Sequence, residues 1–307
     1  MPRQLPILVT TDLQQDAASS RRSRAVNRQA LALAKRLGAP VELVHVAQVD
    51  ALTLVPQAME ILLDSRKEGL RNLAAKLPGV TGARLLAGHP VSAITGLAAR
   101  RGRHELLVQG TSGRTGLGRA FLGSVAEEVL RAARIPVMTV GPRAQSPKAA
   151  TQLESTASPL ILLATGLDPT SAPAEKLALR LAKQTGGRVH AVHHLQAGMH
   201  PLLQTAMSTP SGSRELQDLL RGLRRDAEKQ LTKLAATFKA ARVPFHSTIV
   251  QEGLHASEGI LSEAKKRDAA LIVMGTHARS LLVGGFLGST ARAVILGASA
   301  PVITTHR

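Results

Sequence analysis

Glycine and serine residues recur at matching positions in two stretches of the chain, with a spacing that suits phosphate binding. Aligning residues 105–140 with residues 270–305 gives these pairs: Gly110 with Gly275, Gly123 with Gly288, Ser124 with Ser289 and Pro136 with Pro301. Each stretch reads as an apolar run, a loop, a Gly-Ser step and a helical pattern. A loop between a strand and a helix N-terminus presents backbone N–H groups to an anion. The pattern therefore predicts phosphate binding, and its repetition predicts two related domains.

The first copy has the form G-x2-G-x9-G-S, in which each residue has its own physical task. Gly110 ends an apolar run and lets the chain turn, while Gly113 can adopt the positive φ that other residues avoid. Gly123 allows close approach of the backbone to a phosphate, and Ser124 can cap the next helix or bond a phosphate oxygen. The helix dipole contributes up to about 1 kcal/mol for an anion at this place.

The elements that must position these loops follow one order in both halves. Each half opens with an apolar run, at residues 7–12 and 160–166, and helical and strand-like patterns then alternate. Val26, Ala30, Leu33 and Leu37, for example, fall on one face of a helix. Strands that alternate with helices of this length predict βαβ units and a parallel sheet. We therefore expect an α/β fold.

Two domains follow from the repeat, over residues 1–142 and 159–307. Each is expected to be a Rossmann-like domain with helices on both faces of a five-stranded parallel sheet. Residues 141–158 are rich in Pro, Ser, Thr and Gln and show no periodicity, so we interpret residues 143–158 as the interdomain linker.

Composition limits the classes of function. The 307-residue chain carries a net charge of +18 and no cysteine, which excludes disulfides, thiol catalysis and cysteine-ligated metal. No apolar run suits a signal peptide or approaches the ~18 residues that span a membrane, so we expect a cytoplasmic protein without membrane partners. The positive charge attracts anions. However, four Phe with no Tyr or Trp provide no platform for base stacking, which disfavours nucleic acid as a partner.

The ordered pattern of strand, glycine loop, Gly-Ser step, helix and final Pro-Val strand resembles the ATP-binding signature of the universal stress protein family. The resemblance covers both halves of the chain, and there is no GxxxxGK[ST] motif that would indicate a P-loop NTPase. It implies ATP or a related adenine nucleotide as ligand, with or without Mg²⁺. The residues that it implies for the site are Asp12 near the nucleoside, Val46 at the adenine edge, and Gly110, Gly113, Gly123, Ser124 and Val125 around phosphates and ribose.

The same resemblance places the last strand of each half at a sheet edge. Residues 136–140 (PVMTV) and 301–305 (PVITT) are these strands. Pairing them across a pseudo-twofold axis would hide both edges. We therefore expect an intramolecular pseudo-dimer, with a homodimer of the whole chain as an open alternative.

The second copy departs from the signature. Ala278 replaces the second loop glycine, and Gly166 stands where the first copy has Asp12, with Asp168 two residues later. A methyl group at position 278 disfavours positive φ and narrows the approach to phosphate. The second half is therefore predicted to be a weaker site or no site for nucleotide. Its residues would be Gly275, Gly288, Ser289 and Thr290.

Several other polar residues have a structural and a functional interpretation. Strand alternation separates His193 from His190 and His194, which disfavours a metal site, and His193 matches His45 of the first copy. His277 falls in the second loop, where exposure to solvent is favoured over phosphate contact. Arg114 and Arg119, in the first loop, fit triphosphate contact and plain solvation equally well.

The chain shows no pattern of catalytic residues, such as a G-x-S-x-G elbow or carboxylates paired with a base. We therefore expect a nucleotide-binding sensor or regulator of the stress response that acts on an unidentified protein partner, and not an enzyme, although slow ATP hydrolysis stays open. The alternatives are a nucleotide-free interaction scaffold, a charge-driven nucleic-acid binder, and an electron-transfer flavoprotein or adenylating enzyme built on a related sheet.

Overall fold

The computed structural model describes most of the chain, namely residues 7–13, 17–48, 56–101, 106–111, 122–195, 210–250, 255–276 and 287–305. The first half contains β1 (Ile7–Thr10), α1 (Ala17–Leu37), β2 (Val41–Ala47), α2 (Pro56–Ala75), β3 (Val80–Ala87), α3 (Pro90–Arg101), β4 (Leu106–Gly110), α4 (Ser124–Ala132) and β5 (Val137–Val140). The second half contains β6 (Leu160–Ala164), α6 (Ala172–Thr185), β7 (Arg188–His194), α8 (Pro210–Ala240), β8 (Phe245–Val250), α9 (Ala256–Lys266), β9 (Leu271–Gly275), α10 (Ser289–Gly297) and β10 (Val302–Thr305).

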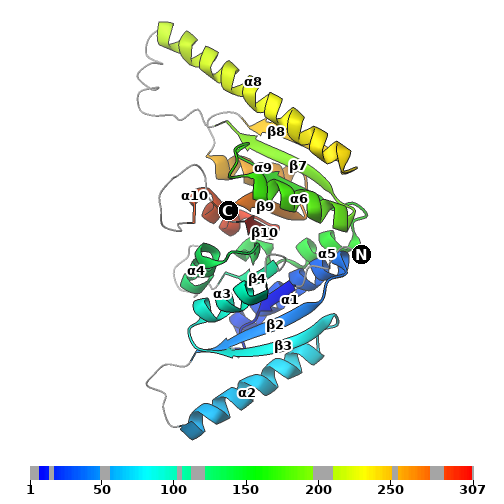
Figure 1. Ribbon diagram of the computed structural model, residues 1–307, viewed down its shortest axis with the longest axis vertical. Coiled ribbons are helices and arrows are strands. Elements are labelled where there is room, and N and C mark those ends of the chain that lie inside the picture. The colour runs from blue at the N-terminus through cyan, green and yellow to red at the C-terminus, as the bar shows by residue number, and fades with distance from the viewer. Residues whose placement is uncertain are drawn as a thin grey trace.

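The ten strands in the described part of the chain join into a single sheet with the order β3-β2-β1-β4-β5-β10-β9-β6-β7-β8. Within each half the neighbouring strands are parallel, and the strand order of the second half mirrors that of the first. The predicted α/β fold with two five-stranded parallel sheets is confirmed. Figure 1 shows the consequence for shape, since the long helices α2 and α8 lie at the two opposite ends of the molecule. The described residues include no helix that is both long and apolar enough to cross a membrane.

The two halves meet where β5 pairs with β10, which is the antiparallel junction of the sheet. Met138 lies opposite Ile303, and these two residues occupy equivalent positions in the repeat. The junction is therefore centred on a pseudo-twofold axis, as the final-strand pairing predicted. Both side chains are completely buried, and neither half presents a free edge at this strand.

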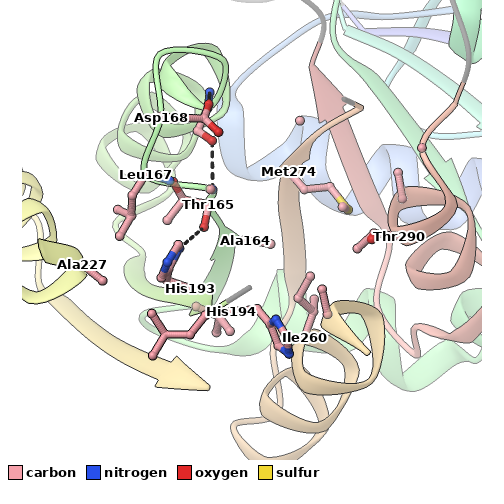
Figure 2. A pocket seen from close by; sticks show the side chains of 18 of the residues that line it. Ala164, Thr165, Leu167, Asp168, His193, His194, Ala227, Ile260, Met274 and Thr290 are labelled. Carbon is pink, nitrogen blue, oxygen red and sulfur yellow. Dashed lines mark hydrogen bonds between the residues drawn. The ribbon is translucent and has the colours of Figure 1, made fainter. Parts of the chain in front are cut away.

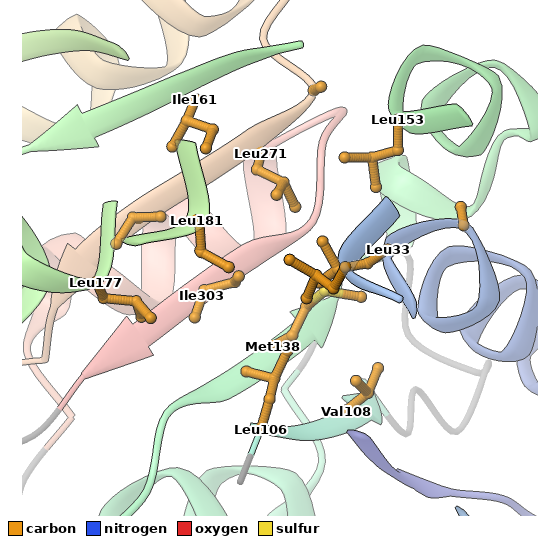
Figure 3. Close-up of a cluster of buried hydrophobic side chains, with 14 of the residues drawn as sticks. Leu33, Leu106, Val108, Met138, Leu153, Ile161, Leu177, Leu181, Leu271 and Ile303 are labelled. Atoms are coloured by element: carbon orange, nitrogen blue, oxygen red, sulfur yellow. The ribbon is translucent and has the colours of Figure 1, made fainter. Parts of the chain in front are cut away.

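One hydrophobic core runs beneath this junction and belongs to both halves. Leu33 of α1 and Leu181 of α6 have no exposed surface, and they join the same buried cluster as Met138 and Ile303. Figure 3 shows these side chains gathered from both halves. The stripe predicted from Val26 to Leu37 is buried along its whole length. Removal of this apolar surface from water is what holds the two halves together.

The segment interpreted as a linker is a helical layer of the core. A short 3-10 helix, η1 (Pro142–Gln145), leads into α5 (Pro147–Ser155), which packs on α1 and buries Ala149, Ala150 and Leu153. Its small residues carry no strong periodic signal, so the sequence pattern did not predict this helix. Arg36, at the end of α1, holds α5 against the rest of the protein. Its guanidinium donates to the carbonyls of Leu153 (2.8 Å), Thr156 and Thr185 (3.4 Å). Cations are stabilised at helix C-termini such as these.

A charge pair crosses the pseudo-twofold axis beside the paired strands. Arg292 of α10 lies 3.3 Å from the carboxylate of Glu127 on α4, and the two positions are equivalent in the repeat. A symmetric dimer of either half alone would place like charges at this point. The duplicated chain instead carries opposite charges there, which favours pairing of the unlike halves.

Reversing one charge at the axis is expected to destabilise the protein. Glu127→Arg or Arg292→Glu should lower the free energy of unfolding by about 1 kcal/mol, because each places like charges together at a partly exposed site. The double reversal should recover most of the loss. Urea unfolding of the four proteins measures the coupling. Additive effects of the two substitutions would show that the pair does not contribute to the junction.

A buried polar network ties α9 to the outer strands of the second half. His190 of β7 lies 2.9 Å from the Thr248 hydroxyl and 3.8 Å from the Glu263 carboxylate. Arg267 donates to Glu263 at 2.7 Å and to Thr248 at 3.3 Å. Burial and the positive charge of Arg267 lower the pKa of His190 to about 4, although Glu263 opposes the shift. His190 is therefore neutral in the folded protein at physiological pH.

This shift predicts acid sensitivity. Between pH 6.5 and 4 the unfolded chain binds a proton at residue 190 that the folded protein does not, so stability falls as the pH falls through that window. The loss should reach roughly 3 kcal/mol at pH 4. Urea unfolding of wild type and His190→Gln across this range tests it. The variant should lose much of the pH dependence, and parallel profiles for the two proteins would refute the assignment.

Candidate functional site

A cavity of about 450 Å³ opens at the carboxyl ends of the strands in the first half. This is where open α/β sheets generally bind ligands. Four of the residues predicted for the site line it together: Asp12, Val46, Gly110 and Val125. Gly123 and Ser124 begin α4 beside them but are not among the lining residues. Gly113 lies outside the described residues, as do Arg114 and Arg119.

The wall formed by the first two strands is held by hydrogen bonds just beyond their ends. Thr11 N–H donates to the Val44 carbonyl at 2.9 Å, and the Thr11 carbonyl lies 2.9 Å from His45 Nδ1. Because a carbonyl only accepts, Nδ1 carries the proton. Burial lowers the pKa of His45, while the bond to Thr11 opposes the shift. His45 is thus a neutral positioning residue for the strand ends.

The Thr11 hydroxyl is the polar group of this cavity that most clearly suits a ligand. Thr11 lines the cavity and is only 7% exposed, and its Oγ1 has no hydrogen-bond partner within the described part of the chain. A buried hydroxyl without a partner costs free energy, which a ligand atom bonded to it would remove.

The opposite wall comes from β4 and the first turn of α4. Gln109 donates from Nε2 to the Ala126 carbonyl at 3.0 Å, which fixes the start of α4 against the sheet. Gly110 is required by close packing, because a Cβ there would lie 2.9 Å from a methyl group of Val26. The helix N-terminus, with its unsatisfied N–H groups, therefore stays beside the cavity.

Two arginines line this cavity that the loop signature did not include. Arg22 comes from α1, and Arg66 comes from α2, where its guanidinium donates to the Leu13 carbonyl at 3.3 Å. Arg22 lies in the first part of α1 and is partly exposed, so it is both on the helix surface and at the cavity. The repeat contains a signal for Arg66. Leu62, Arg66 and Leu70 are spaced four residues apart, and the residues with this spacing in the second half are all apolar, namely Leu223, Ala227 and Leu231.

The second half has a cavity of about 540 Å³ at the equivalent place (Figure 2). All four residues predicted for it, Gly275, Gly288, Ser289 and Thr290, are among its lining residues. Gly288 approaches its neighbour closely, since its N–H donates to the Thr276 carbonyl at 3.1 Å and a Cβ would lie 2.9 Å from that oxygen. The loop residues His277 and Ala278 lie outside the described residues.

Asp168 occupies the space that Gly166 leaves open. Its second carboxylate oxygen lies 2.8 Å from where a Cβ of Gly166 would be, and its first accepts from Thr170 N (2.8 Å) and Ser171 N (3.2 Å). A carboxylate is therefore present at the end of the first strand in both halves. Nearby, Glu175 accepts from the Thr165 hydroxyl at 2.7 Å, and burial raises the pKa of Glu175.

The histidines of β7 divide as strand alternation predicted. His193 Nδ1 lies 3.0 Å from the Thr165 carbonyl, which repeats the bond between His45 and Thr11. His194 lines the second cavity, while His190 belongs to the network with α9. The described residues contain no cluster of three or more ligands suited to a metal ion. The structural role predicted for His193 agrees with this geometry.

Comparison with known proteins agrees with the repeated fold. A model of the universal stress protein family matches residues 5–141 and again residues 160–306. A universal stress protein of Mycobacterium tuberculosis is 28% identical over 261 residues, which covers 82% of this chain and 74% of the relative. One from Methanocaldococcus jannaschii is 32% identical over 123 residues, or 37% of this chain and 71% of the relative.

A solved structure shares the arrangement of the whole chain. The crystal structure of a universal stress protein from Archaeoglobus fulgidus aligns with a TM-score of 0.73 and 20% identity, and the alignment covers 99% of both chains. This likeness concerns the fold. Together with the family match over both repeats, it establishes that the chain belongs to the universal stress protein family.

Proposed function

We propose that this protein is an adenine-nucleotide-binding regulator and that its first half holds the nucleotide. The observation that carries the proposal is the first cavity, where Asp12, Val46, Gly110 and Val125 converge on an open space of about 450 Å³. This volume falls within the usual range for small-molecule sites. If side chains had filled this cavity, the alternative of a nucleotide-free interaction scaffold would have been favoured.

The chemistry of the walls favours an anionic nucleotide. Arg22 and Arg66 supply positive charge, and the N-terminus of α4 supplies N–H donors. Asp12 is suited to accept hydrogen bonds from ribose hydroxyls, and the Thr11 hydroxyl offers a further polar contact. ATP or a related adenine nucleotide, alone or with Mg²⁺, is the ligand that we propose.

A route from the cavity to the domain junction fits a sensing role. Val125 and Ala126 line the first cavity, and the next residue on α4, Glu127, pairs with Arg292 of α10. On α10, Thr290 and Ala291 line the second cavity. A ligand that shifts the first turn of α4 would therefore act on the contact between the two halves. Any such effect requires a ligand that binds two states of the junction unequally.

The other candidate functions can be separated in the same preparation. A universal stress protein from Archaeoglobus fulgidus has been solved in complex with dAMP, so dAMP belongs in the titration beside ATP and ADP. Phosphate release from ATP tests for enzymatic turnover, which we do not expect. Steep salt dependence of RNA or DNA binding would instead favour the nucleic-acid alternative, and absence of any nucleotide would favour the scaffold.

Filling the first cavity is expected to remove nucleotide binding. Val125 is partly exposed in the first turn of α4 and lines the cavity, so Val125→Trp should occupy the space. Calorimetric titration should show at least a ~10-fold loss of ATP affinity, equivalent to about 1.4 kcal/mol.

The matched control is Glu128→Trp, which adds the same side chain at an exposed position of the same helix away from the cavity. It should bind ATP as the wild type does. Unchanged ATP binding by the Val125→Trp variant, with an unchanged melting temperature, would place the nucleotide elsewhere and overturn the proposal.

A further inference from the structure

We infer that the two cavities select different ligands: the first takes a phosphorylated nucleotide, whereas the second takes an uncharged nucleoside and rejects phosphate. The inference rests on the proposed function for the first half and extends it to the second. It depends on charged residues of the helices, which the glycine-loop signature does not include.

The first difference between the cavities lies on the long helices, where an arginine of α2 is replaced by an alanine of α8. Leu62 and Arg66 of α2 line the first cavity, and Leu223 and Ala227 of α8, with the same spacing of four, line the second. The next residues along this spacing, Leu70 and Leu231, are buried in both halves, which confirms the register. Ala227 therefore stands where the first half has Arg66, as Figure 2 shows for its position on the cavity wall.

The second difference between the cavities concerns Arg22, on the helix that follows the first strand of the first half; the corresponding helices are α1 and α6. Gly38 and Gly186 end α1 and α6 with similar left-handed φ angles of 60° and 65°, which aligns the two helices. Counting back equally from each glycine reaches Thr170 opposite Arg22; Thr170 lies just before α6 and is not among the residues that line the second cavity. Ser23 and Ser171, the next residues along, line their respective cavities, in agreement with this alignment. Both arginines of the first cavity are thus replaced by uncharged residues.

One lining carboxylate is added beside the position where Arg66 is lost. Asp226, which lines the second cavity next to Ala227, stands in the place of Ser65 and lies 3.5 Å from Lys229 Nζ. Glu175, in the place of Asn27, is not among the lining residues but accepts from the hydroxyl of Thr165, which is. Asp168 is retained as the counterpart of Asp12. Among the described lining residues, the second cavity has no arginine or lysine. The side chains that line the second cavity therefore attract a phosphate group less than those of the first cavity, which include two arginines.

Part of the frame that would hold an uncharged group is repeated in the second cavity, with His194 in the place of Val46. The bond between His193 and the Thr165 carbonyl repeats that between His45 and Thr11, and Leu223 repeats Leu62. Carboxylates such as Asp168 accept hydrogen bonds from ribose hydroxyls as readily as in the first half. The chemistry fits a nucleoside without its phosphates.

The test uses the full chain with the first cavity blocked by Val125→Trp. Titration with adenosine and with ATP should then report the second cavity alone. Adenosine should bind at least ~10-fold more tightly than ATP. Adding Asp226→Ser with Ala227→Arg, which restores the residues of the first half, should raise ATP affinity at least ~10-fold and leave adenosine affinity within about 3-fold. Retained adenosine binding also shows that the altered chain is folded.

Two matched controls distinguish the effect of an arginine inside a cavity from the effect of an arginine elsewhere on the same helix. Ala236→Arg adds an arginine at an exposed position of α8 and should not improve ATP binding. In the unblocked chain, Arg66→Ala should weaken ATP binding and spare adenosine, while Arg71→Ala, exposed on the same helix, should change neither.

Equal binding of ATP and adenosine by the blocked chain, or binding of neither, would overturn the inference. Failure of the proposed function is a separate result, namely identical ATP titrations for wild type and Val125→Trp. Since adenosine binding by the blocked chain is measured independently, the two outcomes can be told apart.

Discussion

The antiparallel pairing of β5 with β10 is the contact on which the rest of the structure depends. It joins two parallel sheets into one, places Met138 against Ile303 on the pseudo-twofold axis, and brings both halves into a common core. A parallel sheet that ends on an apolar edge strand would otherwise associate with other chains. Because both edges belong to the same chain, pairing costs no association entropy, and α5 adds a helical layer beside α1.

The same symmetry places two cavities at equivalent positions and allows them to diverge. In a dimer of identical domains, a substitution at one site appears at the other, and facing residues on the axis are identical. The duplicated chain is free of that constraint. Glu127 and Arg292 are equivalent residues with opposite charges, and Arg66 gives its cavity a positive charge that its equivalent, Ala227, does not give to the second cavity. Backbone geometry is conserved between the halves, while the electrostatics are not.

Much of the candidate site followed from the resemblance to the universal stress protein family. Asp12, Val46, Gly110 and Val125 were each placed at the end of a strand or the start of a helix, and parallel strands bring such positions to one edge. Arg22 did not follow, because a single helical pattern does not distinguish an arginine facing a cavity from one facing solvent. Arg66 could be recognised only by comparison with the second half, where the equivalent spacing is entirely apolar. The helix at Pro147–Ser155 was missed for a related reason, since its buried residues are mostly alanine.

What the sequence determined by itself is the repeat, the α/β class, the stripes that face the core and the two loops that end in Gly-Ser. These features are local, since the period of apolar residues and the turn preferences of glycine act over a few positions. Only the tertiary structure decided which charges meet at each cavity and which residues lie on the axis. Arg66 and Gly110 come from separate elements, and strand order, register and helix packing alone bring them to the same cavity.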